Sequence, residues 1–225
     1  GYTFFEHTFS DHLPVQIIAT VFGLAIATIG YLYPVIRFFQ RATLHSGQQG
    51  NSSLMIRRML LGSCLSGVAL LGTWGSTQWA PTFADQMVQQ AQENQPANQV
   101  ATTTKARPKE WTLMSISFGA VVGTLLAAGM GDWLGRRLAY FLLCGLSLAS
   151  VYILFLGAHG YGWSFLFWSF IAGTFTASFY GWLPLYLPEL FTTNVRATGQ
   201  GFGFNFGRIL AAIGVLQGGN LMKLF

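Results

Sequence analysis

Two short stretches of this sequence place acidic and arginine side chains at the ends of apolar segments. One is Gly131–Arg137, which reads Gly-Asp-Trp-Leu-Gly-Arg-Arg, and the other contains Glu189 and Arg196. Opposite charges at the edge of a low-dielectric region attract more strongly than they do in bulk water. We therefore predict an ion-pair cluster that acts as a conformational latch, formed by Asp132, Gly135, Arg136, Arg137, Glu189, Arg196 and Arg208. Static anchoring and membrane topology are the alternative role for the same charges.

Hydrogen-bonding and aromatic side chains inside the apolar segments form a second set of candidates. Trp74 and Gln78 belong to the stretch Thr73–Trp79, which is the richest in such groups. Side chains of these types can stack on a small solute and hydrogen-bond to it. The other candidates for a substrate cavity are Tyr180, Trp182, Asn205 and Gln217. Hydrogen bonding between helices is the alternative role for each of them.

The residue types that build enzyme and metal sites are scattered. The two cysteines lie inside apolar stretches and have no partner at metal-ligand spacing, so they read as small buried hydrophobes. The four histidines do not cluster with acids or cysteines: His7, His12, His45 and His159. We therefore predict no catalytic residue, no metal and no cofactor.

The composition indicates that these side chains are carried by membrane-spanning helices. Hydrophobic residues make up 52% of the 225 and charged residues only 8%, whereas a soluble domain has roughly 25% charged residues. The net charge of +5 would suggest a nucleic-acid partner in a soluble protein. The cations lie between apolar stretches and form no basic run, so we predict a lipid bilayer, and no nucleic acid, as the surroundings.

Six stretches are long and apolar enough to cross a bilayer, for which about 20 residues are needed. They predict an all-α, polytopic helical bundle with about six transmembrane helices. The predicted spans are Leu13–Ile36, Met59–Ala80, Leu113–Met130, Leu138–Gly157, Trp163–Leu187 and Phe202 to about Met222.

The distribution of cations predicts which ends of the spans face the cytosol. If the connection after the first span is cytoplasmic, the inner connections hold eight of the 12 Lys and Arg residues and two of the seven acids. The positive-inside rule selects this orientation. The inner cations are then Arg37, Arg41, Arg57, Arg58, Arg136, Arg137, Arg196 and Arg208.

Three local features of the spans and connections predict finer structure. The outer connection 81–110 is long and polar, so we expect a mobile excursion with a short helix over Phe83–Gln92, or else a lid that captures substrate. Pro184 and Pro188 predict a kink in the fifth span. Glycines four residues apart predict close helix packing at three pairs: Gly119 and Gly123, Gly203 and Gly207, and Gly214 and Gly218.

The connection between the third and fourth spans resembles a loop motif of the major facilitator superfamily, Gly-x-Leu-Ala-Asp-Arg-x-Gly-Arg-Arg. Asp132, Gly135, Arg136 and Arg137 match it, whereas Ala128 stands at the first Gly and Trp133 at the first Arg. Glycine is needed in so tight a turn because a side chain would clash there.

The stretch after the fifth span resembles a second motif of that superfamily, Pro-Glu-x-Phe-Pro-Thr-x-x-Arg-Ala-x-Gly. It is similar to members that carry sugars and organic acids in symport. Glu189 and Arg196 occupy its charged positions, and Thr192 stands where the family has Pro. Gly207-Arg208 is similar to the Gly-Arg with which the family begins its next helix.

The resemblance covers about residues 55–225 and implies the C-terminal half of a twelve-helix fold. Residues 55–225 would be helices seven to eleven, with helix twelve and the N-terminal half outside this sequence. Residues 1–54 would be helix six, or an inserted transmembrane helix, followed by a cytoplasmic linker.

The function that the resemblance implies is transport of a small solute, an organic acid, sugar or related metabolite, by alternating access. Coupling to protons is part of this expectation. The expected partners are the solute, the bilayer and the N-terminal half of the same protein, in a cell membrane, which would be the inner membrane of a bacterium. A receptor or sensor on a transporter fold is one alternative, because fold does not fix function. A membrane-embedded enzyme is the other.

Overall fold

The computed structural model describes residues 13–46, 52–93, 107–158 and 160–221, and every regular element in these ranges is helical. Within them, side chains are described for residues 18–37, 54–93, 107–158, 160–193 and 195–212. The predicted all-α class is confirmed. The elements are α2 (Leu13–Ser46), α3 (Ser52–Gly75), η1 (Thr77–Trp79), α4 (Ala80–Glu93), α6 (Pro108–Trp133), α7 (Arg136–Leu156), α8 (Trp163–Ala177), α9 (Phe179–Leu190), η3 (Thr193–Val195) and α10 (Arg196–Leu221).

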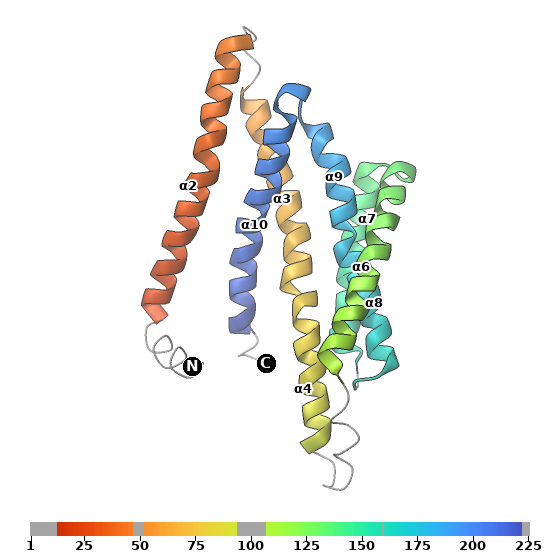
Figure 1. Ribbon diagram of the computed structural model, residues 1–225. Coiled ribbons are helices and arrows are strands. Elements are labelled where there is room, and N and C mark those ends of the chain that lie inside the picture. Colours follow the sequence, from red (N-terminus) through yellow and green to blue (C-terminus); the bar gives the residue numbers. More distant parts are fainter. Residues whose placement is uncertain (1–12, 47–51, 94–106, 159, 222–225) are drawn as a thin grey trace.

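The helices form an antiparallel bundle in which successive passages run in opposite directions (Figure 1). Helix α4 continues the direction of α3, and α9 continues that of α8. The end of α2, the start of α3, the α6–α7 turn and the start of α10 therefore lie at one end of the bundle. We call this the inner end, because the cation count predicts that it faces the cytosol, and the opposite end the outer end.

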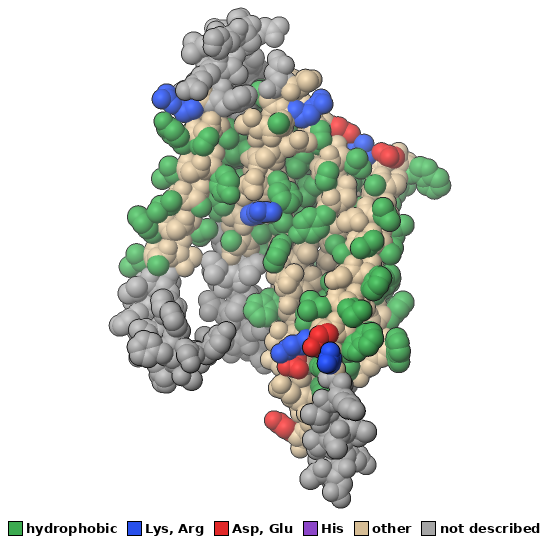
Figure 2. Space-filling model, viewed as in Figure 1, with side chains coloured by type: hydrophobic (Ala, Val, Ile, Leu, Met, Phe, Trp, Pro, Cys, Tyr) green, Lys and Arg blue, Asp and Glu red, His purple; other side chains and the backbone are tan. Residues whose placement is uncertain are grey.

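The surface of the bundle has the character expected of a membrane protein. Hydrophobic side chains cover its flanks, while the acids and most of the bases in view lie near the two ends (Figure 2). Among the described residues, four stretches are long and apolar enough to cross a membrane by length and composition, and they correspond to the first four predicted spans: Ile18–Arg37, Leu54–Glu93, Pro108–Trp133 and Arg136–Leu156. The side chains of Leu125 and Leu148 are 72% and 76% exposed. Exposing them to water would cost free energy, whereas contact with lipid is favourable.

The fifth predicted span is divided into α8 and α9 at Ser178. The Ser178 hydroxyl donates to the carbonyl of Thr174, at 2.6 Å, and also lies 3.1 Å from the carbonyl of Gly123. A Ser hydroxyl that bonds back to the i−4 carbonyl tends to bend a helix. Pro184 and Pro188, at which the sequence predicts a kink, both lie inside α9.

Glycines bring two pairs of helix backbones into direct contact, as predicted for Gly119, Gly123 and Gly207. A Cβ atom on Gly123 would lie 1.9 Å from the carbonyl oxygen of Thr174, and one on Gly119 would lie 2.1 Å from that of Phe170. These contacts join α6 to α8. On the other side, a Cβ atom on Gly207 of α10 would lie 2.7 Å from Ser66 Cβ of α3. The side chains of the third predicted pair, at 214 and 218, lie outside the described residues.

The outer connection contains more helix than the sequence suggests. Helix α4 extends from Ala80 to Glu93, and α6 begins at Pro108. Of the described residues in 81–110, Arg107 alone lies outside a helix. Asp85 of α4 and Lys109 of α6 form an ion pair of 2.9 Å. Ala80 and Ala84 are buried beside Phe165 of α8, so α4 is packed against the bundle at its start.

Helix α2 stands apart from the other helices. It packs chiefly against α10, and the stretch Ile18–Arg37 is not buried. Its contact lies near the inner end, where Leu32 and Val35 meet a cluster that includes Phe191 and Phe202.

Candidate functional site

A two-residue turn between α6 and α7 positions the charged groups at the inner end. Helix α6 ends at Trp133 and α7 begins at Arg136. Between them, Gly135 has a φ of 81°. An L-residue with a side chain is disfavoured in this left-handed region, so the turn depends on glycine. The turn leaves Asp132 in the last turn of one helix and Arg136 in the first turn of the next.

Arg136 bridges α6 and α9 through two carboxylates. Its Nη1 lies 2.9 Å from Oδ1 of Asp132, while its Nη2 and Nε lie 2.9 and 3.0 Å from Oε1 of Glu189. The Asp132 and Glu189 side chains are 69% and 47% exposed. Because both carboxylates reach water, each pair contributes at most about 1 kcal/mol. The cluster can therefore open at a small cost in free energy.

Two further contacts support the cluster. Gly131 is buried, and a Cβ atom there would lie 2.9 Å from Nη1 of Arg136, so the missing side chain makes room for the guanidinium. Arg58 of α3 donates from Nη1 to the carbonyl oxygen of Leu190, 3.2 Å away, at the end of α9. Such bonds satisfy carbonyls that the last turn of a helix leaves without a partner. The sequence did not single out Arg58 for this role.

Three of the predicted cluster members are not joined to it. Arg137 and Arg196 are exposed, and neither makes an ion pair within the described residues. Arg208 lies elsewhere. It follows Arg196, the first residue of α10, by twelve positions, which is about 18 Å along the helix axis. The predicted span begins at Phe202, which would leave Arg208 within two turns of the inner end, whereas the helix begins at Arg196.

A cavity of about 810 Å³ lies at mid-height of the bundle. It is central because its walls include Ala120, near the middle of α6, and Ala177, where α8 ends and α9 is about to begin. The walls come from α3, η1, α6, α8, α9 and α10, which are far apart in the sequence. The lining residues are Leu70, Thr73, Trp74, Thr77, Gln78, Ile116, Ser117, Ala120, Thr124, Gly173, Thr176, Ala177, Tyr180, Arg208, Ala211 and Ala212.

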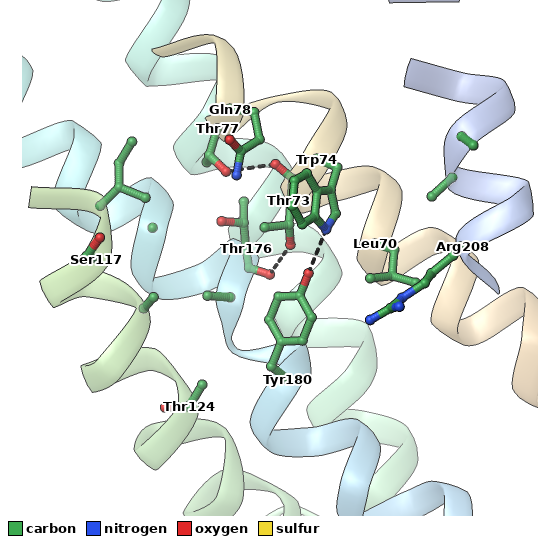
Figure 3. A pocket seen from close by; sticks show the side chains of 16 residues that line it. Leu70, Thr73, Trp74, Thr77, Gln78, Ser117, Thr124, Thr176, Tyr180 and Arg208 are labelled. Atoms are coloured by element: carbon green, nitrogen blue, oxygen red, sulfur yellow. Dashed lines mark hydrogen bonds between the residues drawn. The ribbon is translucent and has the colours of Figure 1, made fainter. Parts of the chain in front are cut away.

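Hydrogen bonds fix the polar groups of the cavity across helix boundaries (Figure 3). The indole N–H of Trp74 donates to the phenol oxygen of Tyr180, 3.1 Å away. The Thr73 hydroxyl lies 3.0 Å from the carbonyl oxygen of Thr176, which ties α3 to α8. Arg208 reaches toward the same space from α10, with its guanidinium carbon 5.0 Å from the ring centre of Phe204.

The structure brings together some of the predicted cavity residues and separates others. Trp74, Gln78 and Tyr180 line the cavity. Trp182 does not: it is 1% exposed, belongs to a buried cluster with Leu143 of α7, and stacks on Tyr186 with ring centres 4.7 Å apart. Asn205 is also outside the cavity lining and bonds to the carbonyl of Gly201 in its own helix, at 2.8 Å. The side chain of Gln217 lies outside the described residues.

Ser117, Thr124 and Arg208 line the cavity although they were not predicted to do so, and the charged member of the three is Arg208. A charged residue far from the ends of a long helix is the feature that could have identified Arg208. The glycines and polar residues before it lower the hydropathy there, so the start of the helix was hard to predict.

A comparison with known families gives a match over nearly the whole chain. The family described as "Sugar (and other) transporter" matches residues 12–221. No solved structure matches the chain.

Proposed function

The chain belongs to the sugar (and other) transporter family of the major facilitator superfamily, and from this premise we propose that it carries a small polar solute across a membrane by alternating access. The single observation that supports this most directly is the cavity of about 810 Å³ at mid-height of the bundle. Transporters built from helical repeats bind their substrates near the bilayer midplane. A site there can be reached from each side in turn.

Trp74, Gln78 and Tyr180 are the proposed substrate contacts. They approach the cavity from α3, η1 and α9. The two aromatic rings offer stacking surface, while the amide and the phenol offer hydrogen bonds to a solute with hydroxyl or carboxyl groups.

The second part of the proposal is an inner latch formed by Asp132, Arg136 and Glu189. The Arg136 guanidinium connects the α6–α7 turn to the end of α9, so movement of α9 away from α6 must break an ion pair. Interfaces that repack their salt bridges are a common element of two-state transitions. Arg137 and Arg196 are proposed to join the latch in another state of the cycle, since both are exposed at the same end.

A further part of the proposal concerns what covers the cavity. Trp74 is 52% exposed although it lines the cavity. An aromatic side chain at this depth is expected to be covered by protein or to contact substrate. We assign residues 55–225 to the C-terminal half of a transporter and the covering surface to its N-terminal half. Helix α2, which packs chiefly against α10, would be helix six of that other half or an inserted helix.

Proton coupling completes the proposal. It requires an ionisable group within the membrane. Among the acids whose side chains are described, Asp132 and Glu189 lie at the inner end, while Asp85 and Glu93 of α4 and Glu110 in the first turn of α6 lie at the outer end. The proposal therefore places the coupling group outside the described residues.

Uptake by the full-length protein in liposomes tests this function. Labelled sugars and organic acids would be supplied outside, with and without a pH gradient. Accumulation of one class above protein-free liposomes supports transport, and its dependence on the gradient supports proton coupling. Saturable binding without uptake would indicate a receptor, and recovery of a chemically altered solute would indicate an enzyme.

A further inference from the structure

Arg208 is a permanently charged group at the depth where a membrane protein tolerates charge least. It lies about 18 Å along α10 from Arg196 at the inner end, and the hydrocarbon core of a bilayer is about 30 Å thick. Charged residues at this depth are rare and usually line a pathway for substrates or ions. Arg208 lines the central cavity, so its position agrees with a pathway.

No carboxylate within the described part of the chain is paired with Arg208. Asp132 and Glu189 are engaged by Arg136 at the inner end, and Asp85 is engaged by Lys109 at the outer end. What the guanidinium meets is the face of Phe204 on its own helix, with 5.0 Å from its central carbon to the ring centre. An aromatic face holds a cation in place, but it contributes no negative charge.

The other walls of the cavity are neutral. Leu70 and Ile116 are apolar, and Tyr180 already accepts the indole N–H of Trp74. Since its oxygen is occupied as an acceptor, the phenol has its own O–H left to donate toward a ligand. A guanidinium and a phenol O–H beside apolar walls form a set of donors for a negatively charged oxygen group.

From this arrangement we propose that Arg208 is the anion-binding residue of the cavity and that the transported solute is a small organic molecule with one carboxylate. This inference rests on the proposed transport function and narrows its substrate class. Guanidinium and carboxylate are planar groups that can join through two parallel hydrogen bonds. One bound carboxylate would neutralise one guanidinium, whereas a phosphate ester with nearly two charges would leave a negative charge uncompensated at low dielectric.

The arrangement also predicts how the carboxylate is placed. Its oxygens would face α10 and the Tyr180 hydroxyl, while the rest of the solute lies against Leu70, Trp74 and Ile116. Lysine at position 208 would keep the charge but lose the planar fork, so it would bind the same anion less tightly.

Uptake by the full-length protein in liposomes, with Arg208→Gln and Arg208→Lys variants, tests this inference. The probes are lactate and gluconate as monocarboxylates, glucose as a neutral solute and glucose 6-phosphate as a phosphate ester. We expect the wild type to accumulate a monocarboxylate. Arg208→Lys should raise KM about tenfold and Arg208→Gln should raise it about 100-fold, because charged hydrogen bonds are lost. Arg57→Gln, an exposed cation of α3 at the inner end, is the matched control and should transport as the wild type does.

Ligand-induced thermal stabilisation in detergent separates recognition from folding. The monocarboxylate should raise the Tm of the wild type and of Arg57→Gln, but not that of Arg208→Gln. If Arg208→Gln does not fold, the KM of Arg208→Lys decides the question. A KM for the monocarboxylate that stays at the wild-type value in Arg208→Lys then overturns the inference.

Other outcomes overturn the inference and leave the transport function standing. They are uptake of glucose that Arg208→Gln does not change, preference for glucose 6-phosphate, and equal loss of neutral and anionic uptake in Arg208→Gln. The last would mean that Arg208 forms a structural ion pair elsewhere in the protein. If the wild type carries no solute of any class, the transport function itself fails.

Discussion

The indole N–H of Trp74, on α3, donates a hydrogen bond of 3.1 Å to the phenol oxygen of Tyr180, on α9. The two residues are 106 positions apart in the sequence. Their bond crosses one wall of the central cavity and connects the helix that begins at the inner end near Arg58 to the helix that ends there at Leu190. A solute that binds to either side chain would therefore affect the positions of both helices.

Tyr180→Phe should weaken solute binding and leave the fold intact. The substitution keeps the ring and removes the oxygen that accepts the Trp74 proton. Because Trp74 and Tyr180 both line the cavity, water in the cavity can replace the lost partner, and stability should change little. We expect KM for uptake to rise about three- to tenfold, the effect of one hydrogen bond. Tyr152→Phe, which removes a phenol oxygen from an exposed side chain of α7, is the control. Equal KM values in both variants would place Tyr180 outside the solute path.

Gly123→Ala should destabilise the protein, whereas Gly129→Ala in the same helix should not. A Cβ atom on Gly123 would lie 1.9 Å from the carbonyl oxygen of Thr174, and one on Gly129 meets nothing within 4 Å. Forcing atoms into a packed interface costs about 1–3 kcal/mol. Thermal unfolding of the purified protein in detergent measures the difference. A Tm for Gly123→Ala equal to that of Gly129→Ala would show that α6 and α8 are not in direct backbone contact.

Glu189→Arg should slow the transport cycle by placing a like charge beside Arg136, and the exchanged pair Arg136→Glu with Glu189→Arg should recover part of the rate. The native contacts are 2.9 and 3.0 Å long, and exposed pairs of this kind contribute at most about 1 kcal/mol. Effects on rate should therefore stay within about tenfold. Initial rates of uptake, normalised to the amount of protein in the membrane, give the answer.

The control for the ion-pair experiment is Arg57→Glu, a charge reversal at the inner end on an exposed side chain of α3. It should leave the rate unchanged. If Glu189→Arg takes up solute at the wild-type rate, these charges do not form a latch, and static anchoring is their role.

Cysteine labelling should find Arg137 and Glu93 on opposite sides of the membrane. In a background of Cys64→Ser and Cys144→Ala, Arg137→Cys would report the inner end and Glu93→Cys the outer end. A membrane-impermeant maleimide should modify the first only in inside-out vesicles and the second only in right-side-out vesicles. The opposite pattern would reverse the predicted orientation. Modification of both cysteines from one side would contradict the placement of the α6–α7 turn and the end of α4 at opposite ends of the bundle.

The helices themselves could be predicted because a bilayer imposes a length on apolar segments. The predicted span Leu113–Met130 lies inside α6, and Leu138–Gly157 differs from α7 by two residues at its start and one at its end. Helix ends were harder to predict. Helix α10 begins six residues before the predicted Phe202, since glycines and polar residues lower the hydropathy of its first turns.

The cavity could be predicted only in part, because the type of a side chain does not say which face of its helix it occupies. Tyr180 and Trp182 were both predicted to face the substrate. Residues two apart on a helix point in nearly opposite directions, about 200° apart. Tyr180 lines the cavity and Trp182 is buried on the far side against α7.

The partners within the charged cluster depended on distances between helices that no sequence pattern supplies. The i, i+4 spacing of Asp132 and Arg136 made their pairing foreseeable even across the turn. The pairing of Arg136 with Glu189, 53 positions away, depends on how α7 and α9 sit beside one another at the inner end.

Helix α4 has a practical consequence for structure determination. The run from Leu54 to Glu93 is 40 residues long, roughly 60 Å at the rise of an α-helix, or about twice the hydrocarbon thickness. Its last turns project past the neighbouring helices (Figure 1), and the Asp85–Lys109 ion pair ties its start to α6. A rigid rod of this kind outside the detergent belt is a natural epitope for an antibody fragment, which would give electron-microscopy particles the alignment feature that a protein buried in a micelle lacks.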